Sequence, residues 1–265
     1  MTEYTIKPIV TGFCKTNKST YIYHPSVHKF YDTEGFEMLP VTVFLVEGNG
    51  KKILIDTGMC QTEIADKYHH PGDTQPEGYA IYEKLEAMGY KCGEITDIIF
   101  THLHWDHIYH MKKFPNAKRY VQRSEYEFAT NPIPLYFKSY EEPRLGLTPQ
   151  FDGLDFVLLD GECEVMDGIS VYLTPGHSIG HQNIVINTKE GKYHCCGDLI
   201  FTYDNLLPVP EMNYDITPPG RFQDIVSEWN SIIDMKKRAG SKEMILPTHD
   251  PLMIELEKEG KVFGA

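Results

Sequence analysis

One stretch of seven residues, Thr101 to His107, constrains this chain more than any other. It reads Thr-His-Leu-His-Trp-Asp-His, so three imidazoles and one carboxylate fall within six residues. The apolar run Ile95–Phe100 directly before it predicts a buried strand. Without a cation these polar groups would be costly to desolvate together, whereas a divalent metal ion makes them a ready ligand set. The stretch therefore predicts a metal site at the end of a strand.

Composition narrows the class of protein. The chain has 265 residues, 41% hydrophobic and 24% charged, as in ordinary globular proteins. Its formal net charge of −13 argues against a nucleic-acid partner, because a phosphate-binding face needs clustered Lys and Arg. No stretch approaches the ~20 apolar residues that a membrane helix needs, and Met1–Lys15 shows no signal peptide. Together with six cysteines, this predicts reduced thiols in the cytoplasm and no membrane partner.

Apolar runs separated by turn residues organise the rest of the chain. Strands are predicted at 4–13, 39–47, 52–56, 95–100, 118–122, 156–159, 163–165, 169–173, 183–187, 192–196 and 244–247. Helices are predicted at 79–88, 124–129 and about 220–238. The segment 15–37 predicts a loop or a short hairpin. The segments 60–78 and 132–153 predict loops, and the last has the length of a lid or binding loop.

Seven side chains share one position, at the end of a predicted strand or in the turn after it: His102, His104, Asp106, His107, His177, Asp198 and His249. Ligands placed there can converge on one rim of a sheet while the strands hold them rigid. Seven ligands are too many for one tetrahedral zinc and suit two metals bridged by a carboxylate and a water. The imidazole and carboxylate mixture favours zinc, with iron, manganese or cobalt as alternatives.

The order of these elements resembles the metallo-β-lactamase superfamily from about Leu39 to His249. The resemblance includes the turn Asp56-Thr57-Gly58 and the final Thr248-His249-Asp250. It implies an α/β (α+β) fold, a four-layer αββα sandwich with the site on the edge between the two sheets. Residues 1–265 would form a single hydrolase domain of this kind.

The resemblance also implies a role for each candidate residue. One metal would be held by His102, His104 and His177, the second by Asp106, His107 and His249, with Asp198 as the bridge. Asp56 and His181 would orient ligands through hydrogen bonds. A hydroxide held between the metals would attack a carbonyl, with Asp106 as the proton shuttle.

Within the superfamily, the segments 102–107, 121–127 and 173–182 resemble the N-acyl homoserine lactonases, the quorum-quenching branch. A small lactone or ester is therefore the expected substrate; another ester or an organophosphate is the alternative. Glyoxalase II has a helical domain after its metal motifs, and only 16 residues follow His249. Redox members replace a motif His with Glu, but His104 is present. The oligomeric state stays open between monomer and homodimer.

One position departs from the lactonase pattern. Those enzymes carry a Tyr three residues after the bridging Asp, and this chain has Phe201 there. Tyr203 is the candidate replacement hydroxyl, although strand alternation leaves its direction open. Trp105, Phe201, Tyr136 and Phe137 are predicted to line the substrate pocket. His69 and His70 are predicted as loop residues rather than ligands.

Overall fold

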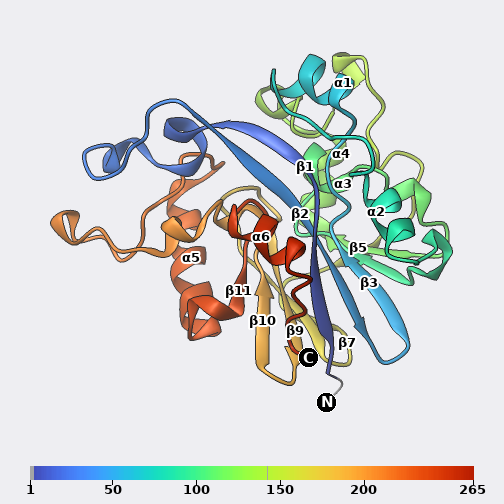
Figure 1. Cartoon of the computed structure of the whole chain (residues 1–265). Coiled ribbons are helices and arrows are strands. Elements are labelled where there is room, and N and C mark those ends of the chain that lie inside the picture. Colours follow the sequence, from blue (N-terminus) through green and yellow to red (C-terminus); the bar gives the residue numbers. More distant parts are fainter. Residues whose placement is uncertain (1–2, 142) are drawn as a thin grey trace.

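The computed structural model describes residues 3–141 and 143–265 and contains two β-sheets with helices on their outer faces (Figure 1). The first sheet has the order β1 (Thr5–Asn17), β2 (Phe36–Gly48), β3 (Lys51–Ile55), β4 (Asp97–Ile99), β5 (Lys118–Gln122) and β6 (Val157–Leu159). The second has the order β11 (Ile245–Leu246), β10 (Gly191–Cys195), β9 (Gln182–Thr188), β8 (Ile169–Leu173) and β7 (Cys163–Met166).

The alternation of side chains along each strand explains why the sheets pack as they do. In β3, Ile53 and Ile55 point into a core between the two sheets, whereas Leu54 points to the helices outside. Ile184 and Ile186 of β9 enter the same inter-sheet core from the other sheet. Successive residues of a strand face opposite sides, so a strand that is apolar throughout is buried on both faces.

The helices complete the outer layers. Beside the first sheet lie α1 (Thr62–Ile64), α2 (Ile81–Ala87), α3 (Trp105–Ile108) and α4 (Arg123–Thr130) (Figure 1). Beside the second lies α5 (Ile225–Ala239), which buries Ile232 and Met235 against it. These layers confirm the predicted αββα fold. The sequence analysis predicted nothing for α6 (Leu252–Lys258), which contacts β1 and places Met253 in the inter-sheet core.

Strand direction brings the candidate ligands to one edge. β3 and β4 are parallel neighbours, so Asp56 and His102 follow strand ends on the same side of the first sheet. β10 and β11 are also parallel, and Asp198 and His249 follow them. The carboxyl ends of parallel strands are a common place for a binding site in sheets of this kind.

The predicted boundaries are confirmed for two short strands, differ by one or two residues for most others, and are wrong in some longer segments. Strands 118–122 and 169–173 coincide with β5 and β8. The predicted loop 15–37 contains the last residues of β1, a π-helix at Lys18–Ile22 and a 3₁₀ turn at Pro25–Val27. The helix predicted from 220 starts only at Ile225, where Asp224 caps it by accepting a hydrogen bond from the Val226 amide at 3.0 Å.

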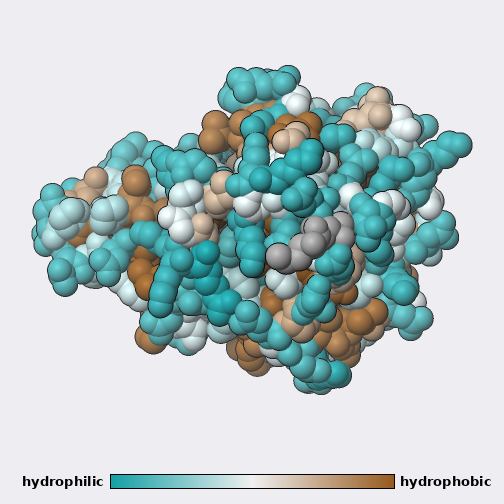
Figure 2. Space-filling view, turned by 90° about the horizontal axis from the view of Figure 1, so that it is seen from below, coloured by the Kyte–Doolittle hydropathy of each residue, from teal (hydrophilic) through white to brown (hydrophobic). Residues whose placement is uncertain are grey.

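Figure 2 shows that the face seen from below carries mostly hydrophilic side chains, with hydrophobic residues gathered in separate patches. Within residues 3–141 and 143–265, no helix combines the length and the apolar character needed to cross a bilayer.

Candidate active site

The His-rich stretch is held on both sides by hydrogen bonds to distant segments. It leaves β4 in extended conformation and turns into α3 at Trp105, so His104 precedes the helix and His107 lies within it. The Leu103 amide donates to Glu125 Oε1 at 3.0 Å, and the Trp105 amide donates to the Ser139 carbonyl at 2.9 Å. The imidazoles are therefore positioned by a fixed backbone.

All seven predicted ligands converge, and they form two groups. In each group the possible ligand atoms lie within 4.8 Å of one another. The groups are His102, His104 and His177, and Asp106, His107, Asp198 and His249. Asp198 joins them, because its Oδ1 is 3.0 Å from Nε2 of both His107 and His249, while its Oδ2 is 3.3 Å from Nε2 of His177.

Three of the imidazoles make a hydrogen bond through Nδ1, the ring nitrogen that points away from the metal-ligand groups. Nδ1 of His107 faces Asp56 Oδ2 at 2.9 Å, and Nδ1 of His249 faces the Pro40 carbonyl at 2.8 Å. The Thr101 hydroxyl donates to Asp56 at 2.8 Å, so it accepts from Nδ1 of His102 at 3.0 Å. Because each Nδ1 donates to one of these acceptors, Nε2 is the ring nitrogen that points into the site and can bind a metal ion.

Those Nε2 atoms fit a metal ion. In His102, His107 and His249 they are buried and make no hydrogen bond to any described residue. Buried polar atoms are normally paired, so several lone pairs that converge without donors indicate a cation site. Imidazole and carboxylate are suitable donors for a divalent transition metal.

The electrostatics agree with this fit in the first group; in the second, the carboxylates of Asp198 and Asp106 outweigh burial and raise the pKa of His107 and His249, so a metal ion there would replace a proton. Burial lowers the pKa of His102 and His104 well below its usual value and that of His177 to about 4, so these rings are neutral, as metal ligands must be. Burial alone would raise the pKa of Asp198, but the imidazoles of His249 and His107 outweigh it and lower that pKa. Asp198 is therefore an ionised carboxylate between the two groups.

Two unusual backbone positions support the ligands. Asp56 has a φ of 61°, and its Oδ1 and Oδ2 accept from the amide and hydroxyl of Thr101, both at 2.8 Å. Gly197, just before Asp198, has a φ of 49°, and a Cβ there would lie 2.7 Å from Thr101 and from His181. A side chain at Gly197 would push Asp198 out of the site.

His181 differs from its predicted role. Its Nδ1 bonds the Thr174 hydroxyl at 2.8 Å, and its ring centroid is 5.2 Å from that of His102. Its Nε2 is buried without a hydrogen bond to any described residue, and burial lowers its pKa to about 3. His181 therefore packs against a ligand, and the predicted hydrogen bond to a ligand is absent from the described structure.

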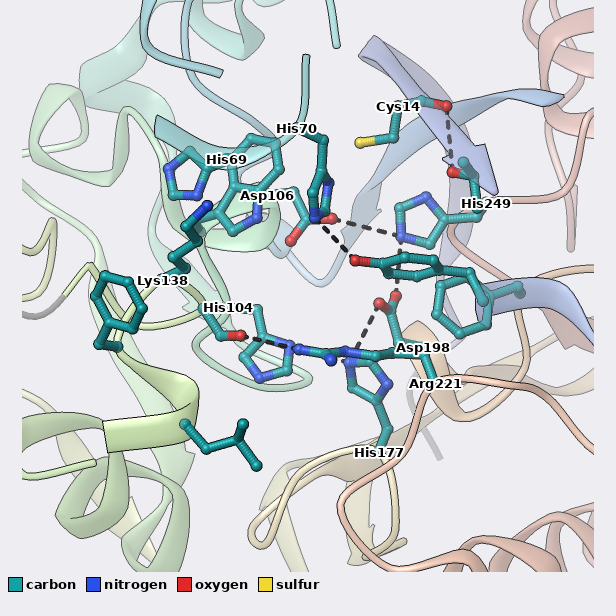
Figure 3. Close-up of a pocket in the computed structure, with 17 residues that line it drawn as sticks. Cys14, His69, His70, His104, Asp106, Lys138, His177, Asp198, Arg221 and His249 are labelled. Atoms are coloured by element: carbon teal, nitrogen blue, oxygen red, sulfur yellow. Dashed lines mark hydrogen bonds and ion pairs between the residues drawn. The ribbon is translucent and has the colours of Figure 1, made fainter. Parts of the chain in front are cut away.

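The metal-ligand groups lie at the base of a cavity of about 270 Å³ (Figure 3). Trp105, Phe137 and Phe201 line it, as predicted. Tyr136 does not line it and instead joins the core beneath the first sheet. Phe201 stacks on the His249 ring at 5.6 Å and so covers one side of the second group.

The prediction that Tyr203 supplies a catalytic hydroxyl is wrong. Its hydroxyl donates to the Ile245 carbonyl at 2.7 Å, and its ring packs in the cores on either side of the second sheet. The chain enters a 3₁₀ turn at Tyr203–Leu206, so strand alternation no longer sets the direction of this side chain. Tyr203 therefore lies outside the cavity.

A different phenol enters the cavity. Tyr21, from the π-helix Lys18–Ile22, lines it and packs edge-on against Phe201 at 6.0 Å. Its hydroxyl pairs with Nε2 of His70 at 2.8 Å, and Nδ1 of His70 lies 3.3 Å from Asp73. Burial raises the pKa of Tyr21 to about 12, so the hydroxyl stays protonated. Neither Tyr21 nor His70 was predicted to line the cavity, because neither belongs to a recognisable motif.

Glu125 was also missed as a member of the site. This buried carboxylate accepts from the Leu103 amide at 3.0 Å and from the Tyr140 hydroxyl at 3.0 Å. It also accepts from the Ser178 hydroxyl at 2.7 Å and the Gly180 amide at 3.0 Å. It thereby ties the His-rich stretch to the loop that carries His177. In the sequence, Glu125 lies in an ordinary helical pattern, and nothing in that pattern indicates a role in the site.

The sequence profile described as the Metallo-beta-lactamase superfamily matches residues 37–249. Together with the two-sheet fold and the seven-ligand site, this match shows that the chain belongs to the metallo-beta-lactamase superfamily.

Two similar proteins are lactonases. The N-acyl homoserine lactonase of Bacillus thuringiensis is 30% identical over 250 residues, which cover 91% of this chain and 92% of that protein. The N-acyl homoserine lactonase AttM of Rhizobium radiobacter is 27% identical over 229 residues, 80% of this chain and 82% of its own.

A solved structure agrees with these relatives. An N-acyl homoserine lactone hydrolase with N-hexanoyl-L-homoserine bound at its catalytic metal center superposes with a TM-score of 0.75 at 27% identity. The superposition covers 100% of this chain and 99% of that one. The resemblance to the lactonase branch, first inferred from three segments, thus extends over the whole fold.

Proposed function

We propose that this chain is a metal-dependent lactonase that opens N-acyl homoserine lactones or closely related lactone rings. One observation carries the proposal: seven imidazole and carboxylate ligands converge, five of them lining one cavity, in a chain similar to lactonases along nearly its whole length. A metal centre alone would fit many hydrolases, and the similarity selects this branch.

Two zinc ions are the proposed cofactors. His102, His104 and His177 would hold one, Asp106, His107 and His249 the other, and Asp198 lies where it can serve both. When bound, such a pair of ions lowers the pKa of a water between them and polarises the ester carbonyl. Zinc is chosen because its usual ligands are these imidazole and carboxylate groups.

Asp106 is the proposed proton carrier. It lines the cavity, and its Oδ2 is 3.8 Å from Nε2 of His249 and 4.0 Å from Nε2 of His107. Its side chain is 14% exposed, in contrast to the buried imidazoles, so it can reach the reacting atoms. As water adds to the carbonyl and the ring C–O bond breaks, Asp106 accepts the proton of the water and returns it to the alkoxide oxygen.

The other residues of the cavity form the walls around the bound substrate. Phe201 and Trp105 are aromatic walls, and Trp105 is fixed by stacking on His69 at 4.0 Å. Tyr21 offers a protonated hydroxyl on the same side as Phe201. These groups exclude water around the substrate.

We place the reaction in the cytoplasm, on a freely diffusing small molecule. All six cysteines are free, in accordance with a reducing compartment. The formal charge of −13 supports the absence of a nucleic-acid partner.

The test is a substrate panel run with zinc restored: N-acyl homoserine lactones of several chain lengths, simple lactones, a linear ester and a phosphotriester. Ring opening is followed by acid release. We expect lactones to be hydrolysed faster than the linear ester and the phosphotriester. Preference for the phosphotriester, or no lactone hydrolysis by protein that holds two zinc ions per chain, contradicts the proposal.

A further inference from the structure

The cavity contains two cationic side chains that the proposed reaction does not use. Arg221 and Lys138 both line it, although neither belongs to a strand or helix that carries a ligand. Figure 3 shows Arg221 reaching across the cavity beside His104 and His177, with Lys138 on the opposite side. Their presence calls for a physical explanation, because positive charges near a metal site oppose cation binding.

Neither cation has an acidic partner among residues 3–141 and 143–265. Two other arginines have a carboxylate partner, Arg123 with Asp160 at 2.9 Å and Arg238 with Glu162 at 2.9 Å. The only acidic side chains that line the cavity in the described part of the chain are Asp106 and Asp198, both metal-ligand candidates. A chain with 38 acidic and 25 basic residues had many partners to offer, yet these two charges face the cavity without one.

Arg221 is positioned rather than free. Its Nη2 donates a hydrogen bond to the Ser139 hydroxyl at 3.3 Å, and the guanidinium lies 5.8 Å from the ring centres of both Tyr21 and Tyr136. Two aromatic faces and one hydrogen bond fix the planar group and leave most of its five donors available. A fixed guanidinium with spare donors matches the geometry of a carboxylate or phosphate.

We propose that the natural substrate carries an anionic group, a carboxylate or a phosphate, which binds Arg221 with support from Lys138. This inference rests on the proposed lactonase function and names its substrate class. The reacting ring lies over the metal-ligand groups while the anion lies against Arg221. Hydrolysis itself is unchanged: water adds, the ring C–O bond breaks, and a hydroxy acid is released.

The experiment compares three substrates with the same ring: γ-butyrolactone bearing a carboxylate, a phosphomethyl group or a neutral carboxamide. We expect kcat/KM for at least one anionic substrate to exceed that for the carboxamide by about tenfold or more, mainly through a lower KM. Arg221→Gln should lower this ratio at least fivefold, and Lys138→Gln should lower it less. Arg123→Gln is the matched control, because this exposed, paired arginine lies outside the cavity and should leave the ratio unchanged.

Calorimetric binding separates this inference from the reaction. Tetrahydrofuran-2-carboxylate and its carboxamide lack a bond to cleave, so their affinities can be compared even if no lactone is hydrolysed. Tighter binding of the carboxylate that is lost in Arg221→Gln supports the anion site. Equal binding overturns it. So does a carboxylate preference that survives in the double variant Arg221→Gln/Lys138→Gln, because the anion then binds the metals.

In the kinetic experiment, equal losses on all three lactones in Arg221→Gln would also overturn the inference, since Arg221 would then act on the reacting ring.

Discussion

The base of the cavity and its wall are built in different ways. The metal-ligand groups at the base follow the ends of strands, and hydrogen bonds fix the outer nitrogens of His107 and His249. The wall residues Tyr21, Lys138 and Arg221 come from segments between the strands, and each has at most one direct polar partner. The sheets thus determine where chemistry happens, whereas the intervening segments determine what can bind.

This difference has an energetic consequence. A ligand at the base cannot change without leaving several buried lone pairs or donors unpaired, which is costly. A wall residue can change at the cost of one hydrogen bond or one packing contact. Substitutions at the base should therefore abolish function, and substitutions in the wall should redirect or weaken it.

The largest effect is expected for Asp198→Asn. This change removes the negative charge that lies 3.0 Å from two imidazoles and 3.3 Å from a third. The loss of lactone hydrolysis should exceed the roughly 10- to 100-fold typical of residues that only orient a ligand. Steady-state rates and elemental analysis of the purified variant measure it. Asp160→Asn, an exposed carboxylate outside the cavity, is the control and should keep full activity.

A smaller loss is expected for Asp56→Asn. The amide can still accept from Thr101, but its NH₂ group would face the Nδ1 proton of His107 and favour the wrong tautomer. Metal affinity should fall roughly 10- to 100-fold, as measured by competition with a chelator. Asp97→Asn changes a buried aspartate of the same sheet that pairs with Lys51, away from the site, so its metal affinity should match wild type. Equal affinities in the two variants would refute the orienting role.

Glu125→Gln tests how the two metal loops are tied together. Glutamine offers one acceptor oxygen where four donors now converge, and its NH₂ faces donors. The free energy of unfolding should fall by about 1–3 kcal/mol, measured by urea denaturation. Glu127→Gln, two residues further along the same helix and exposed, should change it little. A Glu125→Gln protein as stable as wild type would show that these bonds contribute little.

The smallest effect is expected for Tyr21→Phe. The change removes one protonated hydroxyl from the wall but no ligand and no charge, so kcat/KM should fall less than about tenfold with metal affinity unchanged. Tyr31→Phe removes a nearby hydroxyl that bonds Thr217 and does not line the cavity, and it should leave the rate as it is. A loss in Tyr21→Phe as large as in Asp198→Asn would break the distinction between base and wall.

The same distinction explains what the sequence could predict. His102, Asp198 and His249 follow apolar runs, and the position of a residue after a strand determines the sheet edge on which it lies. Tyr203 was predicted wrongly because a 3₁₀ turn replaces the strand there, and its hydroxyl finds the Ile245 carbonyl. Arg221 lies in an irregular segment before α5, where no periodicity relates sequence to direction.

Packing between segments that are distant in the sequence could likewise not be predicted from the sequence pattern. Glu125 contacts residues 22 and 55 positions away, and only the assembled fold shows that its carboxylate is buried. Helix α6 escaped prediction because it is short, and its one fully buried apolar residue, Met253, gives no clear helical repeat.

Stepwise metal restoration tests the central claim, that the two ligand groups form one two-metal hydrolase centre, most directly. Protein freed of metal by chelation is titrated with zinc while hydrolysis of N-hexanoyl homoserine lactone and bound metal are measured together. We predict no activity at the start and a maximum at two bound ions per chain. Full activity in protein shown to be free of metal, or a maximum reached at one ion per chain, would contradict the account.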